Sequence, residues 1–475
     1  MKDDGQCFLC GSPCSQHCPY CGEHVCSQVH YEYHRPAWEE SRISDPVASM
    51  RDESLCQPFR LEYGDKGRYL VATRDIHPLQ LIMTDSPCVV GPPAKTVPVC
   101  LECLAPLTPA SPPCPGCSLP LCAPSCFSGP LHHQECSLLS SSQHSISIKD
   151  YSSPHILYSA IVPLRMWLLK TSNNNQGWQK VNFLQEGDPE ELGKSKMWNE
   201  VADYITNIMN IKDFPKDEVL RLTGIKATNA NSLEPTGVSG TGLYPLYPLM
   251  NSYCYCNTMY TIDKVTKQME VRAQRFIPAG AEITTRYVIP MMGQPARSNY
   301  IWNNWGFICS CERCSDPTEL CTMFSGVRCM DDDGYLLPAK LCKPGDSWLC
   351  DHCGQIVEEK DIVARLDRLE NIIDNTNLTD AEEGERLLEY LGLHLHHNHH
   401  YILRVKTELL HLYTFGHKDR SRPVLDRRLQ LALDILQVSR IYSRENFILY
   451  SSRIYLLSIV GTLFYILVEY VYYQQ

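Results

Sequence analysis

Apolar residues in the last third of the chain recur every three or four positions, which places them on one face of an α-helix. Three such faces can be traced, and they comprise Ile362, Leu366, Leu369 and Ile373; Ile402, Val405, Leu409 and Tyr413; and Leu429, Ala432, Leu433 and Leu436. Helices of this kind bury their apolar faces by stacking on their neighbours. The pattern therefore predicts a helical, TPR-like domain over residues 357–475.

The earlier part of the chain mixes two patterns. Residues 64–76 contain apolar runs bounded by turn residues, which is typical of short β-strands. The region between Asp150 and Pro245 has helical character, most clearly over residues 158–169. Together with the helical C-terminal region, these patterns predict an α+β fold.

One apolar stretch near the C-terminus allows two interpretations. Residues 454–468 carry no charge and are bracketed by Arg453 and Glu469. A membrane-spanning helix needs about 20 apolar residues, so this shorter stretch favours a buried helix over a tail anchor. A membrane partner is therefore not expected.

Composition narrows the functional class. The 475 residues are enough for two or three domains, and the net charge of −11 argues against direct nucleic-acid binding. Many of the 25 cysteines are paired with two residues between them, and no apolar signal segment follows Met1. These features favour zinc in a reducing cytoplasm or nucleus over disulfide bonds in a secreted protein.

Cysteines and one histidine, the residue types that bind zinc, recur at regular spacing over a stretch of 37 residues in the first third of the chain. They are Cys100, Cys103, Cys114, Cys117, Cys122, Cys126, His132 and Cys136. Two residues between cysteines let one tight turn present two thiolates to one tetrahedral zinc ion. Eight ligands complete two closed sites and leave no position for a reactive water, so the spacing predicts structural zinc and protein binding rather than catalysis.

A less complete copy of this pattern precedes it. Its ligands are Cys7, Cys10, Cys18, Cys21, Cys26 and His30, and the last pair is missing. If ligand pairs alternate between sites, Cys7, Cys10, Cys26 and His30 complete one zinc site. Cys18 and Cys21 then need two further ligands, for which His34, His17 and Cys14 are the alternatives.

Two further clusters remain open to interpretation. Cys350-x2-Cys353 with Cys329 suggests a small zinc ribbon, whose fourth ligand is Asp332, Cys342 or Cys321. Five histidines lie between His394 and His400, but a run of histidines without ordered cysteines or carboxylates is a weak metal signal. The helical interpretation of this run is favoured.

Four segments carry a resemblance to a known family. Residues 64–76 resemble the start of a SET domain, and residues 249–257 are similar to the SET motif Asn-His-Ser-Cys-x-Pro-Asn. Residues 278–287 resemble the segment that ends in the SET tyrosine, and residues 305–314 resemble the post-SET CxCx2C site. With the inserted zinc module, which resembles a MYND finger, this order resembles the SET and MYND domain-containing protein methyltransferases. The extra N-terminal finger suggests their arthropod-type branch.

The resemblance implies a domain plan of a β-rich SET domain with an inserted zinc finger, a post-SET zinc site and a helical C-terminal domain. The expected segments are 1–45, a degenerate MYND-like finger; 55–99, the N-terminal SET part; 100–136, the MYND finger; 140–304, the helical insert and SET core; 305–318, the post-SET site; 319–356, a possible zinc ribbon; and 357–475, the helical domain.

The resemblance also implies site residues. Cys309, Cys311 and Cys314 supply three zinc ligands, and the family supplies the fourth from the position of Cys254. S-adenosylmethionine is expected at Gly67, Arg68, Tyr69, Asn251, Ser252 and Phe307. Tyr287 matches the tyrosine at the site of methyl transfer. Four positions depart from the family: Ser252 replaces a histidine, Tyr253 and Cys256 replace the usual serine and proline, and Tyr69 stands where a small residue is expected.

Two functions are compatible with these residues. The first is a zinc-containing protein-lysine N-methyltransferase that uses S-adenosylmethionine, with a role in chromatin or transcription regulation. The second is a protein-interaction scaffold or transcriptional co-repressor, whose MYND finger and helical domain bind partners while the active site has decayed. Tyr287 and Phe307 support the first, whereas Ser252 and Tyr69 support the second.

Overall fold

The computed structural model describes residues 57–65, 67–140, 146–172, 175–188, 193–211, 213–289, 291–338, 346–416 and 421–442. These residues fall into two compact units. The first unit comprises residues 57–251 and 260–283, and the second comprises residues 252–259 and 284–442. The mixed helix and strand content confirms the predicted α+β class.

Ten short strands form three small sheets in the first two thirds of the chain, ordered β1-β2-β10-β7, β3-β9-β8 and β4-β6-β5. Their bounds are β1 Phe59–Gly64, β2 Gly67–Ala72, β3 Leu81–Asp85, β4 Val89–Gly91, β5 Ala230–Ser232, β6 Thr241–Leu243, β7 Asn251–Ser252, β8 Thr258–Ile262, β9 Met269–Ala273 and β10 Glu282–Thr285. Along β9, buried and half-buried positions alternate, which is the two-residue period of a strand with one face in the core.

Strands β1 and β2 form an antiparallel hairpin whose register ends at the pair Gly64 and Gly67. Gly67 has a φ of 87°, a left-handed conformation that glycine adopts without steric cost. The hairpin continues into β10, which pairs Ile283 with Leu70. The predicted strands over residues 64–76 are thus confirmed.

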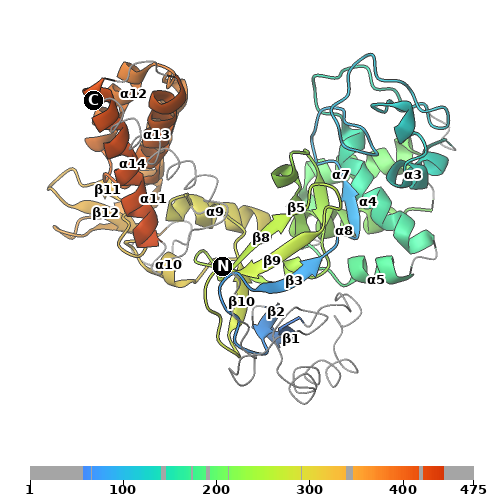
Figure 1. The fold of residues 1–475 in the computed structure, drawn as a ribbon, viewed down its shortest axis with the longest axis horizontal. Helices are drawn as coiled ribbons and strands as arrows, with labels where there is room; N and C mark the ends of the chain where they lie inside the picture. The colour runs from blue at the N-terminus through green and yellow to red at the C-terminus, as the bar shows by residue number, and fades with distance from the viewer. Residues whose placement is uncertain are drawn as a thin grey trace, which may run out of the picture. The chain divides into compact units, whose positions relative to one another are not determined.

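The helices of the first unit are η3 Pro124–Cys126, α3 Pro130–Ser140, α4 Ile156–Thr171, α5 Asn175–Asn182, α7 Lys196–Asp203, η4 Tyr204–Ile208, α8 Lys216–Asn229, η5 Glu234–Thr236 and η6 Tyr247–Leu249. Helix α4 confirms the helix predicted over residues 158–169. It packs against α3, α5, α7, α8 and β4 (Figure 1). Most of its residues are buried. A helix that is apolar nearly all round belongs in a core.

The second unit contains a small sheet and a group of helices. Strands β11 Val327–Arg328, β12 Tyr335–Pro338, β13 Ser347–Cys350 and β14 Ile356–Glu358 pair in chain order. The helices are α9 Gln294–Trp305, α10 Glu312–Ser315, α11 Glu359–Asn375, α12 Ala381–Gly392, α13 His400–His411, η7 Leu412–Gly416 and α14 Arg422–Tyr442. Helix α13 packs on α12 and α14, and the sheet packs on α11 (Figure 1).

Two of the three predicted helix faces are confirmed. The first is buried on α11 except for the half-buried Leu366, and the second is buried on α13 and η7. The third is wrong by about one position, because Leu433 is 47% exposed on α14. The buried face of α14 contains Leu431, Ile435 and also Arg428, whose charge interrupts the apolar pattern in the sequence.

The histidine run has a structural role at the start of α13. His399 is the N-cap of this helix, and its Nδ1 accepts a hydrogen bond of 3.1 Å from the Tyr401 amide. A side-chain acceptor at this position satisfies an amide that has no partner within the helix. Within the described ranges, none of the five histidines joins a group of potential metal ligands.

The described ranges contain no helix that is both long enough and apolar enough to cross a membrane. Residues 454–468, for which a buried helix is predicted, lie outside those ranges. The N-terminal zinc finger with Cys7, Cys10, Cys18, Cys21, Cys26 and His30 also lies outside them.

Candidate functional site

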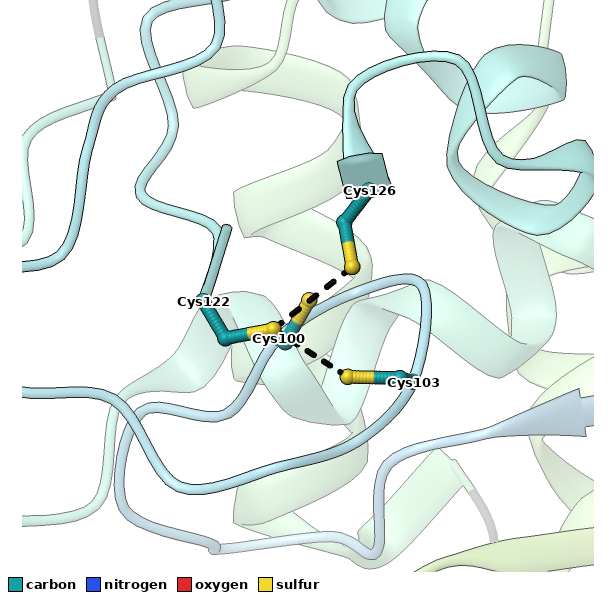
Figure 2. Close-up of side chains that lie close together, drawn as sticks. All are labelled: Cys100, Cys103, Cys122 and Cys126. Atoms are coloured by element: carbon teal, nitrogen blue, oxygen red, sulfur yellow. Dashed lines mark hydrogen bonds between the residues drawn. The ribbon is translucent and has the colours of Figure 1, made fainter. Parts of the chain in front are cut away.

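Four of the predicted zinc ligands in the first unit converge on one point. The thiol groups of Cys100, Cys103, Cys122 and Cys126 lie within 4.8 Å of one another. The Cys122 sulfur lies 3.3 Å from that of Cys103 and 3.5 Å from that of Cys126 (Figure 2). The first and third ligand pairs therefore share one site, which is compatible with one tetrahedral zinc ion bound by four thiolates.

The other four predicted ligands form a second group. The sulfurs of Cys114 and Cys136 are 3.7 Å apart, and the Cys117 sulfur lies 3.6 Å from Nε2 of His132. Cys114 and Cys117 come from one turn, whereas His132 and Cys136 come from one face of α3. Because an i, i+4 pair on a helix points to the same side, α3 presents both ligands together. The set suits a Cys3His zinc site.

The two turns that carry Cys-x2-Cys have the same backbone hydrogen bonds, which define what we call a knuckle turn. The amide of the first cysteine donates to the carbonyl five residues later, at 2.8 Å for both Cys100 and Cys114. The amide four residues after that cysteine donates back to its carbonyl, from Leu104 in one turn and Ser118 in the other. Leu104 and Ser118 both have positive φ values, 64° and 63°. This geometry directs two thiolates to one side of the turn.

A buried ion pair connects the second zinc site to α4. Glu135 lies next to Cys136 on α3, and both of its carboxylate oxygens accept hydrogen bonds of 2.8 Å from Arg165. Arg165 also donates to the carbonyls of Val90 and Leu101. Glu135 Oε1 lies 3.8 Å from Nδ1 of His132, the ring nitrogen that faces away from the zinc ligands. At this distance the carboxylate forms no hydrogen bond with the ring, but its charge attracts the Nδ1 side of the imidazole electrostatically.

Replacing Glu135 with glutamine is expected to weaken zinc binding at the Cys3His group by about 10- to 100-fold, the usual effect of changing an outer-shell group, because the variant removes the carboxylate charge beside His132 and the ion pair that anchors α3 to Arg165. Competition with a chelator that reports released zinc measures this change. Glu218→Gln is the matched control, because Glu218 pairs with the half-exposed Lys170 and has no contact with the site. Equal zinc release from Glu135→Gln and the wild type would contradict the assigned role.

The second unit contains a further group of four cysteines. Cys254, Cys309, Cys311 and Cys314 are all buried, with the Cys254 sulfur 3.5 Å from that of Cys314 and 4.0 Å from that of Cys309. Cys254 comes from the loop after β7, whereas the other three surround the start of α10. The structure therefore brings the fourth predicted ligand to the other three across 55 residues of sequence. Four converging thiolates suit a closed zinc site.

Buried charges surround these cysteines. Nη2 of Arg297 lies 3.5 Å from the sulfur of Cys314, and the side-chain amide of Gln294 donates to the Cys314 carbonyl at 2.9 Å. Glu319 accepts hydrogen bonds from Arg297 and from Arg313, so the three side chains together carry one net positive charge. Zinc bound by four thiolates carries two negative charges, and a buried cation beside it lowers the cost of burying them.

Tyr287, Trp305 and Phe307 form an aromatic cluster in the second unit. The ring centroid of Tyr287 lies 4.8 Å from that of Trp305 and 6.4 Å from that of Phe307. Burial raises the pKa of Tyr287 to about 12, so its hydroxyl stays protonated at neutral pH. The family resemblance points to Tyr287 and Phe307 but not to Trp305, whose position two residues before Phe307 in the same motif is a usable signal.

Ser252, also in the second unit, has an unusual environment. Its Oγ is buried and has no hydrogen-bond partner among the described residues. A buried hydroxyl without a partner costs free energy, so this atom is available to a bound ligand. The observation fits a polar cofactor group at this position, although serine reaches less far than the expected histidine.

The remaining candidates belong to the first unit. The ring of Tyr69 packs against Gly64, where an added Cβ would lie 3.1 Å from its Cε1 atom. The Tyr69 ring therefore lies back over the hairpin turn. Arg68 donates to the Phe183 carbonyl, and Asn251 donates to Glu282 at 2.8 Å. A Cβ added at Gly67 would meet no atom within 4 Å, which leaves its backbone open to close approach by a ligand.

Comparison with known proteins places these features in context. No protein-family model matches the chain. It is 25% identical over 363 residues to SET domain-containing protein SmydA-8, isoform A, from Drosophila melanogaster, covering 70% of this chain and 76% of that protein. It is 21% identical over 379 residues to histone-lysine N-methyltransferase ASHR1 from Arabidopsis thaliana, covering 73% and 75%. A shorter segment is 32% identical over 152 residues to histone-lysine N-methyltransferase SET5 from Candida glabrata, covering 31% of this chain and 27% of that protein.

Among solved structures, Rubisco LSMT bound to AdoMet aligns with 81% of this chain at 12% identity and a TM-score of 0.31, which is too low to support an argument. The chain is therefore similar over about 70% of its length to SET-domain proteins, and its cysteines converge in groups that could hold zinc. SmydA-8 is one of the proteins to which it is similar over most of its length, in agreement with the SET-like motifs of the sequence.

Proposed function

We propose that this chain is a zinc-containing protein-lysine N-methyltransferase that uses S-adenosylmethionine and acts on proteins of chromatin or of the transcription machinery. The observation that carries the proposal is the aromatic cluster of Tyr287, Trp305 and Phe307, because it places a protonated tyrosine hydroxyl in a largely apolar setting. Relatives named histone-lysine N-methyltransferases support the same reaction class.

Zinc in this proposal is structural. It occupies the two groups of the MYND finger and the group of Cys254, Cys309, Cys311 and Cys314, where the donors match its preferences. The cofactor is held by Gly67, Arg68, Tyr69, Asn251, Ser252 and Phe307, as the family resemblance implies. When bound, S-adenosylmethionine supplies an electrophilic methyl group.

Tyr287 has the principal chemical role in the chain. A substrate lysine must be neutral to act as a nucleophile, and burial beside aromatic rings disfavours its charged form. The Tyr287 hydroxyl oxygen accepts a hydrogen bond from the amine and fixes the direction of its lone pair. The apolar neighbours Trp305 and Phe307 exclude water from the amine. Orientation and desolvation, rather than a protein nucleophile, supply the rate enhancement.

Ser252→His is expected to tighten S-adenosylmethionine binding by about ten- to a hundredfold, because a hydrogen bond to a charged group is worth about 1.5–3 kcal/mol. Isothermal titration calorimetry of the wild type and the variant measures the change. Ser172→His, at the exposed C-cap of α4, controls for the added imidazole and should leave affinity unchanged. A Ser252→His affinity at or below that of the wild type would contradict the proposed contact.

The second candidate function is a protein-interaction scaffold or co-repressor with a decayed active site. Ser252 in place of the family histidine favours it. Protein partners would then bind through the MYND finger and the helical domain. Calorimetry decides between the two functions: absence of cofactor uptake at millimolar concentration, in both the wild type and Ser252→His, would support the scaffold and overturn the enzyme.

A further inference from the structure

A fourth group of metal-binding side chains lies in the small sheet of the second unit, away from the cysteines around α10. It comprises Cys329, Asp332, Cys350 and Cys353, whose ligand atoms all lie within 4.8 Å of one another. The sulfurs of Cys329 and Cys353 are 3.8 Å apart, and the Cys350 sulfur lies 3.4 Å from Oδ1 of Asp332. The ligands come from the loop between β11 and β12, from the last residue of β13 and from the turn that follows it.

The Cys350 turn has the same geometry as the two knuckle turns of the MYND finger. The Cys350 amide donates to the Gln355 carbonyl at 2.8 Å, and the Gly354 amide donates back to the Cys350 carbonyl at 3.2 Å. Gly354 has a φ of 73°. Leu104 and Ser118, at the equivalent positions of the other two turns, have similar positive φ values. The molecule therefore repeats at Cys350 the turn that presents two thiolates elsewhere.

The Cys329 loop faces this turn with a related closure. The Cys329 amide donates to the Gly334 carbonyl at 2.9 Å, again five residues later. A Cβ at Gly334 would lie 2.7 Å from the Cys350 sulfur and 2.7 Å from Cβ of His352. The two loops thus approach so closely that only glycine fits between them, which holds the four ligand atoms together.

Asp332 is oriented as a ligand by its neighbours. Its Oδ1 accepts a hydrogen bond of 2.8 Å from the Gly334 amide, and its Oδ2 lies 2.6 Å from Nδ1 of His352. Hydrogen bonds of this kind fix the orientation of a ligating carboxylate. Of the other ligands considered, Cys321 is exposed and belongs to no group, and Cys342 lies outside the described residues.

We propose that Cys329, Asp332, Cys350 and Cys353 bind one zinc ion, with the Asp332 carboxylate as the fourth ligand. Three thiolates select zinc over magnesium or calcium, and one oxygen ligand is compatible with tetrahedral zinc. The ion joins the β11–β12 and β13–β14 hairpins, so it stabilises the sheet that packs on α11.

The test measures zinc per chain by elemental analysis of the purified full-length protein. The double variant Cys350→Ser/Cys353→Ser is expected to lose about one zinc relative to the wild type, whereas the control Cys321→Ser loses none, because its thiol lies outside the group. The proposal would be overturned if the double variant had the circular dichroism spectrum of the wild type and also its full zinc content.

A second variant keeps the test decisive if the double variant fails to fold. Asp332→Cys supplies a fourth thiolate, so its zinc ion is expected to resist a competing chelator for longer than in the wild type. Asp332→Ala removes the fourth ligand, so its zinc ion is expected to be released faster. Asp331→Ala serves as the control, since Asp331 bonds Gln355 and is not in the group. Identical release from the wild type, Asp332→Cys and Asp332→Ala would exclude Asp332 as a ligand.

Discussion

Replacing Cys311 with serine is expected to remove one zinc ion from the second unit and to lower its thermal unfolding temperature strongly. Structural zinc contributes on the order of 10 kcal/mol to the folding of small zinc sites, since the site does not exist in the unfolded chain. Cys311 is buried with Cys254, Cys309 and Cys314, so a hydroxyl in its place leaves three thiolates without a complete coordination shell. Arg297, which lies against Cys314, would then lack the negative site that it faces.

Elemental analysis and a thermal scan followed by circular dichroism measure both effects. Cys256→Ser is the matched control: Cys256 is buried nearby in sequence, but its thiol contacts the Thr258 carbonyl at 3.3 Å and belongs to no metal-binding group. A serine hydroxyl can keep that contact, so zinc content should not change. Full zinc content and an unchanged unfolding temperature in Cys311→Ser would show that the four cysteines do not hold a structural ion.

Replacing Tyr287 with phenylalanine is expected to lower the turnover number for lysine methylation by about 10²- to 10³-fold, similar to the loss of one preorganised hydrogen-bonding group in other enzymes. The ring remains packed on Trp305 and Phe307, so the variant removes only the orienting hydroxyl. Cofactor affinity should stay within about twofold of the wild type, because the lost interaction acts on the amine in the transition state.

Turnover is measured with radiolabelled S-adenosylmethionine on histone mixtures, and affinity by calorimetry. Tyr390→Phe is the control, since Tyr390 is 40% exposed on α12 and lies outside the aromatic cluster. Because burial raises the pKa of Tyr287 to about 12, ionisation of its hydroxyl should not shape the rate below about pH 10. Wild-type turnover in Tyr287→Phe would remove Tyr287 from the mechanism.

Cysteine pairs with local spacing can be recognised in the sequence, and the structure brings their thiols together. The Cys-x2-Cys pairs at Cys100 and Cys114 needed no distant information, because a single turn fixes where both thiolates point. The helices of the C-terminal part were also predictable, since their apolar period of three to four residues is a local property. Leu433 is the exception. The buried Arg428 interrupts the apolar pattern, so the periodicity predicted the wrong buried face for this helix.

What the sequence by itself determined is therefore local: the Cys-x2-Cys turns, the helical periods and the order of the SET-like motifs. Only the tertiary structure decided which partners meet across long separations. It selected Asp332 rather than Cys321 beside Cys350, paired Glu135 with Arg165, and placed Trp305 on Tyr287. These contacts depend on how strands and helices pack, and packing is a property of the whole core that residue spacing does not encode.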